Sequence, residues 1–176
     1  MIEEKLVISD TNIFLDLISV NMLEAFFSLP CAFSTTDFVM NEIIKTEQRK
    51  EIGKYVDTKK LQVVSFDVED LLKIAEIHSQ NTNNASFTDC SVWYHAKKTG
   101  GRLLTGDSKL RKVAENNDLK VSGILYIFDN LIEYGIISEY IAAGLLESLI
   151  QINMRLPKGE CSKRIAQWRE NKTKLL

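Results

Sequence analysis

Short, largely apolar segments recur along this chain, each followed by a segment whose apolar residues have helical spacing, and the first of them runs without polar alternation up to Ser9. An unalternating run is typical of a strand that helices cover on both faces, as in a parallel sheet. The pattern therefore predicts an α/β fold with a central parallel sheet. The predicted strands are residues 6–9, 31–34, 61–65, 102–105 and 119–122.

Helical segments are expected between and after these strands. Asn21 is expected to cap the second helix, and Thr35 or Thr36 the helix that follows the second strand. In that third helix, the residues expected to face inward are Phe38, Val39, Ile43 and Ile44. The remaining predicted helices are residues 13–19, 21–29, 48–57, 67–79, 86–98, 109–116, 124–134 and 138–153.

The length of 176 residues suits one ordinary domain with an appended segment. We expect a domain at 1–153, including the two apolar-rich helices after residue 122, and a basic C-terminal tail at 154–176. Residues 155–176 hold seven Lys or Arg and two Asp or Glu, a charge of +5 that leaves −7 for the rest of a chain of net charge −2. Such a tail is either an arm for a polyanion or a solvated helix face.

Composition favours a globular protein with a real core, since 45% of residues are hydrophobic and 26% are charged. No apolar run approaches the ~20 residues of a membrane-spanning helix. The first residues lack the pattern of a secretory signal. Cys31, Cys90 and Cys161 are scattered and odd in number, which indicates reduced thiols. The expected location is the cytoplasm.

Acidic residues follow strands or open helices at several places. Asp10 and Asp107 each follow a predicted strand, Asp89 opens a helix after a polar loop, and Glu42 lies in the helix after the second strand. Each has a structural alternative: Asp10 and Asp107 can be helix N-caps, Ser86 and Asp89 resemble a capping box, and Glu42 can be solvated.

Together, these carboxylates suggest a cation site. Ligands gather at the carboxyl ends of parallel strands, and Asp10 and Asp107 are expected to meet there. Clustered carboxylates repel each other unless a cation neutralises them. Oxygen ligands without Cys or His favour Mg²⁺ or Mn²⁺, and such an ion can lower the pKa of bound water and neutralise a phosphodiester. Asp16, one helical stretch after Asp10, is expected on the surface.

Other catalytic classes find less support. His78 and His95 lie in predicted helices without a nucleophile motif, and we expect both at the surface or at helix ends. Gly100 and Gly101 match neither a P-loop nor a dinucleotide-binding fingerprint.

The chain resembles the PIN domain family from about residue 6 to residue 121. The resemblance lies in Val7-Ile8-Ser9-Asp10-Thr11-Asn12, in Glu42, in Asp89 at the start of a helix, and in Leu103-Leu104-Thr105-Gly106-Asp107 followed by Leu110-Arg111. It implies a three-layer α/β/α sandwich and metal-dependent ribonuclease activity. By this resemblance, the catalytic and metal-binding residues are Asp10, Glu42, Asp89 and Asp107, with Asn12 and Thr105 as polar supports.

The leading hypothesis is a Mg²⁺- or Mn²⁺-dependent endoribonuclease. Lys109, Arg111 and Lys112 are then either near RNA phosphates or on a solvated helix face. Small family members are often VapC-type toxins that an antitoxin inhibits, although residues after 122 exceed what a compact toxin requires. The alternative is a non-catalytic PIN-like module that binds RNA or a protein. The expected partners are RNA, an antitoxin and a second copy, with no membrane. The apolar stripe of Ile141, Leu145, Leu149 and Ile152 suits either internal packing or a partner face.

Overall fold

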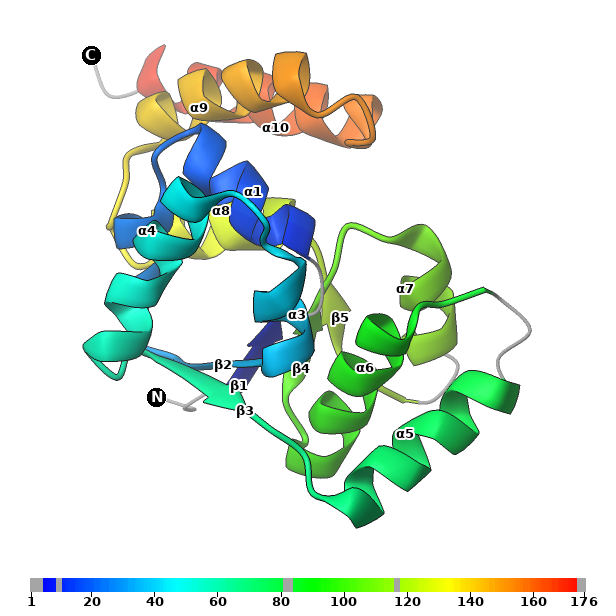
Figure 1. The fold of residues 1–176 in the computed structure, drawn as a ribbon. Coiled ribbons are helices and arrows are strands. Elements are labelled where there is room, and N and C mark those ends of the chain that lie inside the picture. Colours follow the sequence, from blue (N-terminus) through cyan, green and yellow to red (C-terminus); the bar gives the residue numbers. More distant parts are fainter. Residues whose placement is uncertain (1–4, 9–10, 81–83, 116–117, 174–176) are drawn as a thin grey trace.

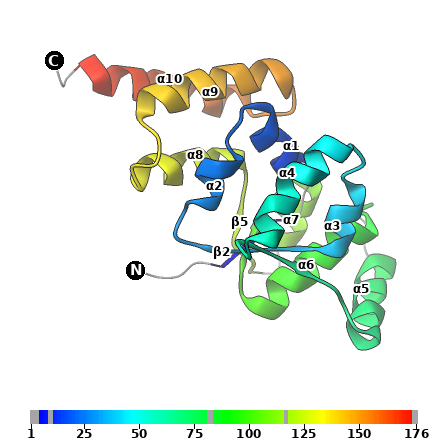
Figure 2. The same ribbon diagram turned by 60° about the vertical axis from the view of Figure 1, so that its left-hand side comes forward.

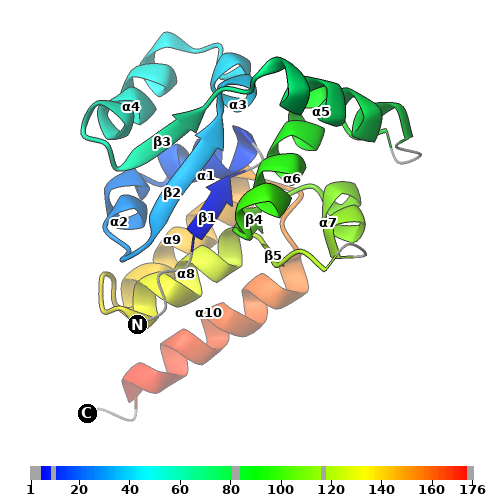
Figure 3. The same ribbon diagram turned by 90° about the horizontal axis from the view of Figure 1, so that it is seen from below.

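A five-stranded parallel sheet forms the centre of the protein (Figure 3). The computed structural model describes residues 5–8, 11–80, 84–115 and 118–173, and for 5–8, 113, 115 and 171–173 it describes the backbone alone. The strand order is β3-β2-β1-β4-β5. The strands are β1 (Lys5–Ile8), β2 (Ala32–Thr36), β3 (Leu61–Val64), β4 (Arg102–Leu104) and β5 (Val121–Ser122).

Helices cover both faces of the sheet, which confirms the predicted α/β/α arrangement (Figure 1). On one face α6 packs on β1, β2 and β4, and α5 lies against α6. The opposite face carries α1, α2 and α8, with α9 and α10 beyond them. The helices are α1 (Thr11–Ser19), α2 (Leu23–Phe27), α3 (Asp37–Glu42), α4 (Thr46–Asp57), α5 (Val68–Gln80), α6 (Phe87–Thr99), α7 (Ser108–Glu115), α8 (Ile124–Glu133), α9 (Glu139–Ile152) and α10 (Lys158–Thr173).

The sheet order creates a crevice between the carboxyl ends of β1 and β4. The chain first builds outward from β1 to β2 and β3, and then crosses to place β4 on the other side of β1. Ile8 at the end of β1 pairs with Leu104 at the end of β4. Such a reversal of direction is the place where open α/β sheets bind ligands. The segments that follow these two strands therefore meet at one edge.

Two local predictions were wrong. Asn21 does not cap α2, because it adopts φ 54° and the helix begins only at Leu23, after Met22. Ile44 is 90% exposed, because α3 ends at Glu42 and no longer directs residue 44 toward the core. Thr36, one of the two expected caps, does cap α3 by accepting a hydrogen bond from Val39 N at 3.4 Å.

The basic C-terminal segment is mostly the helix α10, which packs along α9 (Figure 2). Cys161 and Trp168 of α10 are buried in the core, and the Trp168 ring lies 6.1 Å from that of Phe128 in α8. The spacing of the apolar residues Cys161, Ile165 and Trp168 is that of an amphipathic helix. This contact joins the end of the chain to the same hydrophobic core as the sheet.

The apolar stripe of α9 is divided between interior and surface. Leu149 is buried and Leu145 is half-buried, as internal packing requires. Ile141 and Ile152, at the two ends of the stripe, are 50% and 59% exposed. Internal contacts therefore account for the middle of the stripe.

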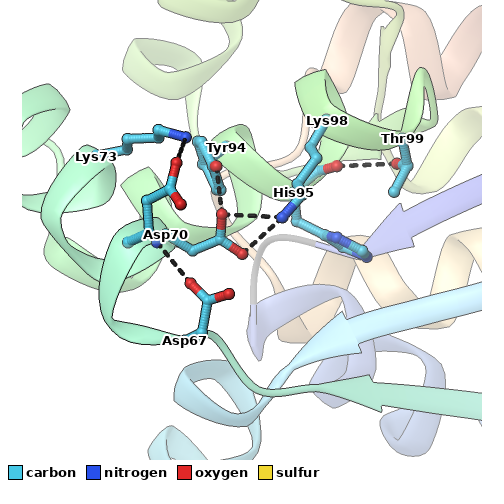
Figure 4. Close-up of polar contacts among 8 residues, drawn as sticks. Asp67, Asp70, Lys73, Tyr94, His95, Lys98 and Thr99 are labelled. Atoms are coloured by element: carbon cyan, nitrogen blue, oxygen red, sulfur yellow. Dashed lines mark hydrogen bonds and ion pairs between the residues drawn. The ribbon is translucent and has the colours of Figure 1, made fainter.

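A polar network fastens α5 to α6 (Figure 4). The carboxylate of Asp70 accepts hydrogen bonds from Tyr94 Oη at 2.5 Å and from Lys98 Nζ at 2.7 and 2.9 Å. The bond from Lys98, followed by that from Tyr94, holds the pKa of Asp70 below its ordinary value. Asp67 accepts a hydrogen bond from Asp70 N and so caps the first turn of α5. The network secures the outer helix on this side of the sheet.

None of the helices in the described part of the chain is both long and apolar enough to cross a membrane.

Candidate active site

Asp107 lies directly beyond β4 and is held by the backbone around it. Its Oδ1 accepts hydrogen bonds from Lys109 N at 2.6 Å and Leu110 N at 2.9 Å, at the first turn of α7. Its own N–H donates to Thr105 Oγ1 at 2.9 Å. Thr105 is fully buried, so its hydroxyl fixes the turn that presents Asp107. Asp107 therefore caps α7 through Oδ1, and its Oδ2 forms no hydrogen bond with a described residue.

Asp89 occupies the third position of α6 in a complete capping box. Asp89 Oδ2 accepts hydrogen bonds from Ser86 N at 2.9 Å and Ser86 Oγ at 2.8 Å, and Asp89 N donates to Ser86 Oγ at 3.0 Å. The box uses Oδ2, and within the described residues Oδ1 accepts no hydrogen bond. Capping and ligand binding are therefore compatible at this residue.

Glu42 is the last residue of α3 and reaches toward the start of α1. Its Oε2 accepts a hydrogen bond from Thr11 Oγ1 at 2.7 Å. Thr11 is the first residue of α1 and comes three positions after Ile8, the last residue of β1. This contact, which the sequence reasoning missed, brings Glu42 to the edge where β1 ends.

The three described carboxylates interact electrostatically. Burial raises the pKa of the Asp89 carboxyl above its ordinary value, against the hydrogen bonds from Ser86, which lower it. The negative charges of Asp107 and Glu42 raise the pKa of Asp89 further. Carboxylates from α3 and the β4–α7 turn thus act on the carboxylate of Asp89 in α6, at one edge of the sheet. Their ionised forms repel, which favours a nearby cation.

The fourth acidic position, Asp10, lies outside the described residues. Among the residues that the structure describes, no three Asp, Glu, His or Cys side chains form a metal site by themselves. The chemistry of the donors still suits a hard divalent cation, since every candidate ligand is a carboxylate oxygen. The predicted site also includes Asp10, and its assignment as a ligand stays a prediction.

The predicted supporting and RNA-binding residues have differing surroundings. Asn12, in the first turn of α1, is half-buried and lines a groove beside the acidic edge. Thr105 supports the backbone of Asp107, not a carboxylate. Lys109 and Lys112 are exposed on α7. Arg111 is half-buried, and its Nη2 donates to Thr105 O at 3.5 Å.

Two expectations about polar residues were wrong. Asp16 is only 9% exposed, and Asn153 Nδ2 donates to both of its carboxylate oxygens. His95 is 6% exposed, with Nε2 3.0 Å from Ser34 Oγ, and burial lowers its pKa. His78 is exposed near the end of α5, as expected.

A buried hydroxyl pair joins the helices that carry Glu42 and Asp89. Thr36 Oγ1, the cap of α3, lies 3.1 Å from Ser91 Oγ of α6. Ser91 Oγ donates to Thr88 O at 2.7 Å, so the single hydroxyl proton between the pair comes from Thr36. Nothing in the sequence links residues 36 and 91, because the contact depends on the placement of α6 over β2.

A family model described as "PIN domain" matches residues 6–170. The match spans the strands, the acidic edge and most of α10. The chain belongs to the PIN domain family. No curated protein matches the chain significantly. The resemblance recognised in the sequence is thereby confirmed at the level of the family, and it extends about fifty residues beyond the stretch on which it was first recognised.

Membership places this PIN domain in a superfamily of nucleases, which indicates a hydrolase in broad terms. PIN domain nucleases typically use divalent metal ions, and the carboxylates at the edge of this sheet agree with such a requirement.

Proposed function

We propose that this PIN domain is a Mg²⁺- or Mn²⁺-dependent endoribonuclease that hydrolyses RNA phosphodiester bonds. The observation that carries the proposal is that Glu42 and Asp107, from two other elements, lie close enough to Asp89 for their negative charges to raise its pKa, at the edge of the sheet where β1 and β4 are neighbours. Like charges are brought together in this way at sites that bind a cation.

In this proposal, Asp10, Asp89 and Asp107 hold the cation and Glu42 completes the cluster or orients water. The bound cation would supply a water of lowered pKa and neutralise charge on the phosphodiester. The chain holds the carboxylates in place: Ser86 fixes Asp89, the first turn of α7 fixes Asp107, and Thr11 fixes Glu42. Lys109 and Lys112 on the exposed surface of α7 would approach flanking phosphates.

The proposal is tested by cleavage of a labelled RNA of mixed sequence in Mg²⁺, in Mn²⁺ and in EDTA. Wild type should cleave only with a metal ion, and both Asp10→Asn and Asp107→Asn should abolish cleavage while the protein stays folded. Asp118→Asn is the matched control, because it makes the same charge change at an exposed residue after α7. Asp118 has φ 57°, a conformation that Asn also tolerates.

Equal cleavage by wild type and Asp107→Asn would contradict the mechanism. RNA binding with no metal-dependent cleavage under any condition would instead indicate the non-catalytic binding module.

A biological role as the toxin of a type II toxin–antitoxin pair is a further part of the proposal. It is supported by membership of the PIN domain family, whose small members are often toxins. Growth arrest on expression, relieved by the product of a neighbouring reading frame and absent for Asp107→Asn, would support it. Unimpaired growth on expression of active enzyme would contradict it.

A further inference from the structure

A groove of about 980 Å³ runs from the candidate active site to the turn between α9 and α10. At one end it is lined by Asn12, Thr105 and Gly106, which belong to the acidic edge. At the other end it is lined by Arg155 and Leu156 of the α9–α10 turn. Part of the groove wall therefore comes from the hairpin of α9 and α10, and the other end of the groove reaches Gly106 and Ser108, the two chain neighbours of Asp107.

Some charged side chains that line the groove are paired with other residues of its lining, and others are not. Arg164 donates to Asp129 from Nε and Nη2, at 2.9 to 3.1 Å, and to Glu160 at 3.5 Å. Asp16 accepts two hydrogen bonds from Asn153. Most acidic side chains of the groove are thus held by its own residues.

Arg155 differs from Lys163, Arg164 and Arg169, which lie in the same C-terminal segment and are held in ion pairs. Its side chain is exposed and makes no ion pair with any residue that the structure describes. Lys163 pairs with Glu160, and Arg169 pairs with Glu147 on the surface of α9. Among the described side chains of this segment, the cations without an ion pair are Arg155 in the α9–α10 turn and the exposed Lys158 at the start of α10, and of these two Arg155 lines the groove.

We infer that this groove holds the single-stranded RNA that flanks the scissile bond, with a backbone phosphate at Arg155. The inference rests on the proposed function and deepens it. Arg111 is a second cation that lines the groove, and its Nη2 donates to Thr105 O next to the acidic edge. Leu125, Leu156 and Pro157 give the groove an apolar lining that can contact the faces of nucleotide bases. These faces are exposed in a single strand, whereas in a duplex they are buried by stacking. The hairpin is then part of the substrate site.

The experiment measures binding separately from cleavage. A fluorescein-labelled single-stranded RNA of mixed sequence is titrated with the full chain in EDTA, and anisotropy is followed at several salt concentrations. Arg155→Ala is compared with Lys60→Ala. The side chain of Lys60 is exposed and forms no hydrogen bond or ion pair with a described residue, and Lys60 precedes β3 at the opposite edge of the sheet. Both variants lose one positive charge.

Arg155→Ala should weaken binding several-fold and reduce the slope of log K against log salt by about 0.7, the value for one phosphate contact on a single strand. Lys60→Ala should leave both unchanged. Equal affinity and slope for wild type and Arg155→Ala would overturn the inference, and so would failure of wild type to bind the RNA, which would leave a peptide as the alternative occupant.

Cleavage is measured in parallel with Mg²⁺ and Mn²⁺. RNA binding that depends on Arg155, without any cleavage, would support the inference that the groove binds RNA and contradict the proposed nuclease activity. Cleavage by wild type, together with unchanged RNA binding by Arg155→Ala, would contradict the inference about the groove and leave the proposed nuclease activity standing.

Discussion

The side-chain amide of Asn153, just after α9, donates hydrogen bonds to both carboxylate oxygens of Asp16 in α1, at 3.1 and 2.9 Å. The two residues are 137 positions apart. Asp16 and Asn153 also line the groove, so the contact fixes the C-terminal hairpin against the helix that starts at the acidic edge.

Asn153→Ala should lower the free energy of unfolding by about 2 kcal/mol, because hydrogen bonds to a charged group contribute about 1.5–3 kcal/mol and the buried carboxylate loses two donated bonds. Urea unfolding of the two proteins measures the difference. Ser148→Ala, at an exposed position of α9, should change stability little. A loss for Asn153→Ala no larger than that of the control would contradict the assigned role of the contact.

The Thr36–Ser91 pair should matter for both stability and activity. Thr36→Val keeps the shape of the side chain but removes the cap of α3 and the proton donated to Ser91, at a cost of about 2 kcal/mol. Thr36→Ser keeps the hydroxyl and should restore most of the stability. Because the pair joins the helices of Glu42 and Asp89, cleavage under folding conditions should fall in Thr36→Val and recover in Thr36→Ser. Identical behaviour of the two variants would show that the hydroxyl is unimportant.

Local signals in the sequence predicted most of the fold. The short apolar segments predicted all five strands of the described sheet, and the capping box that Ser86 and Asp89 resembled in the sequence is present. Short-range rules succeed here because each depends on neighbours within one turn or one strand. They failed at Asn21, where the backbone turns left-handed before the helix can begin.

The buried polar residues show what local sequence patterns can and cannot predict. Asp16 lies three residues after Ile13 and four before Val20, both buried, so the helical spacing did mark its inward position. His95 similarly follows Val92 by three residues. What the spacing does not reveal is a partner such as Asn153 or Ser34, because these contacts arise only after distant elements pack. The same limit hid the groove, whose wall comes from the last helices.

Trp168 tests whether α10 is integral to the fold. Its ring is 5% exposed and packs toward Phe128 of α8. Trp168→Ala should lower the free energy of unfolding by about 3–5 kcal/mol, the usual cost of removing a buried aromatic side chain. The neighbouring exposed substitution Gln167→Ala should have little effect in the same denaturant titration. A single transition with an unchanged midpoint for Trp168→Ala would show α10 to be an independent appendage.

Asp89 should make the metal-free protein less stable at neutral pH than an uncharged residue would. Burial, with Asp107 and Glu42 in addition, raises the pKa of Asp89 in the folded state. Between the pKa of the unfolded chain and this raised value, the folded protein holds more protons than the unfolded one. The free energy of unfolding therefore falls as pH rises through that window, and below it the effect vanishes.

Asp89→Asn cannot ionise and lacks this fall, so in EDTA its stability relative to wild type should increase as pH rises from acid toward neutral. Urea unfolding of both proteins across this range measures the effect. Added Mg²⁺ or Mn²⁺ should then stabilise wild type by mass action and leave Asp89→Asn nearly unaffected. A variant that loses stability relative to wild type as pH rises in EDTA would contradict the repulsion. Equal stabilisation of both proteins by the metal ion would place the cation away from Asp89.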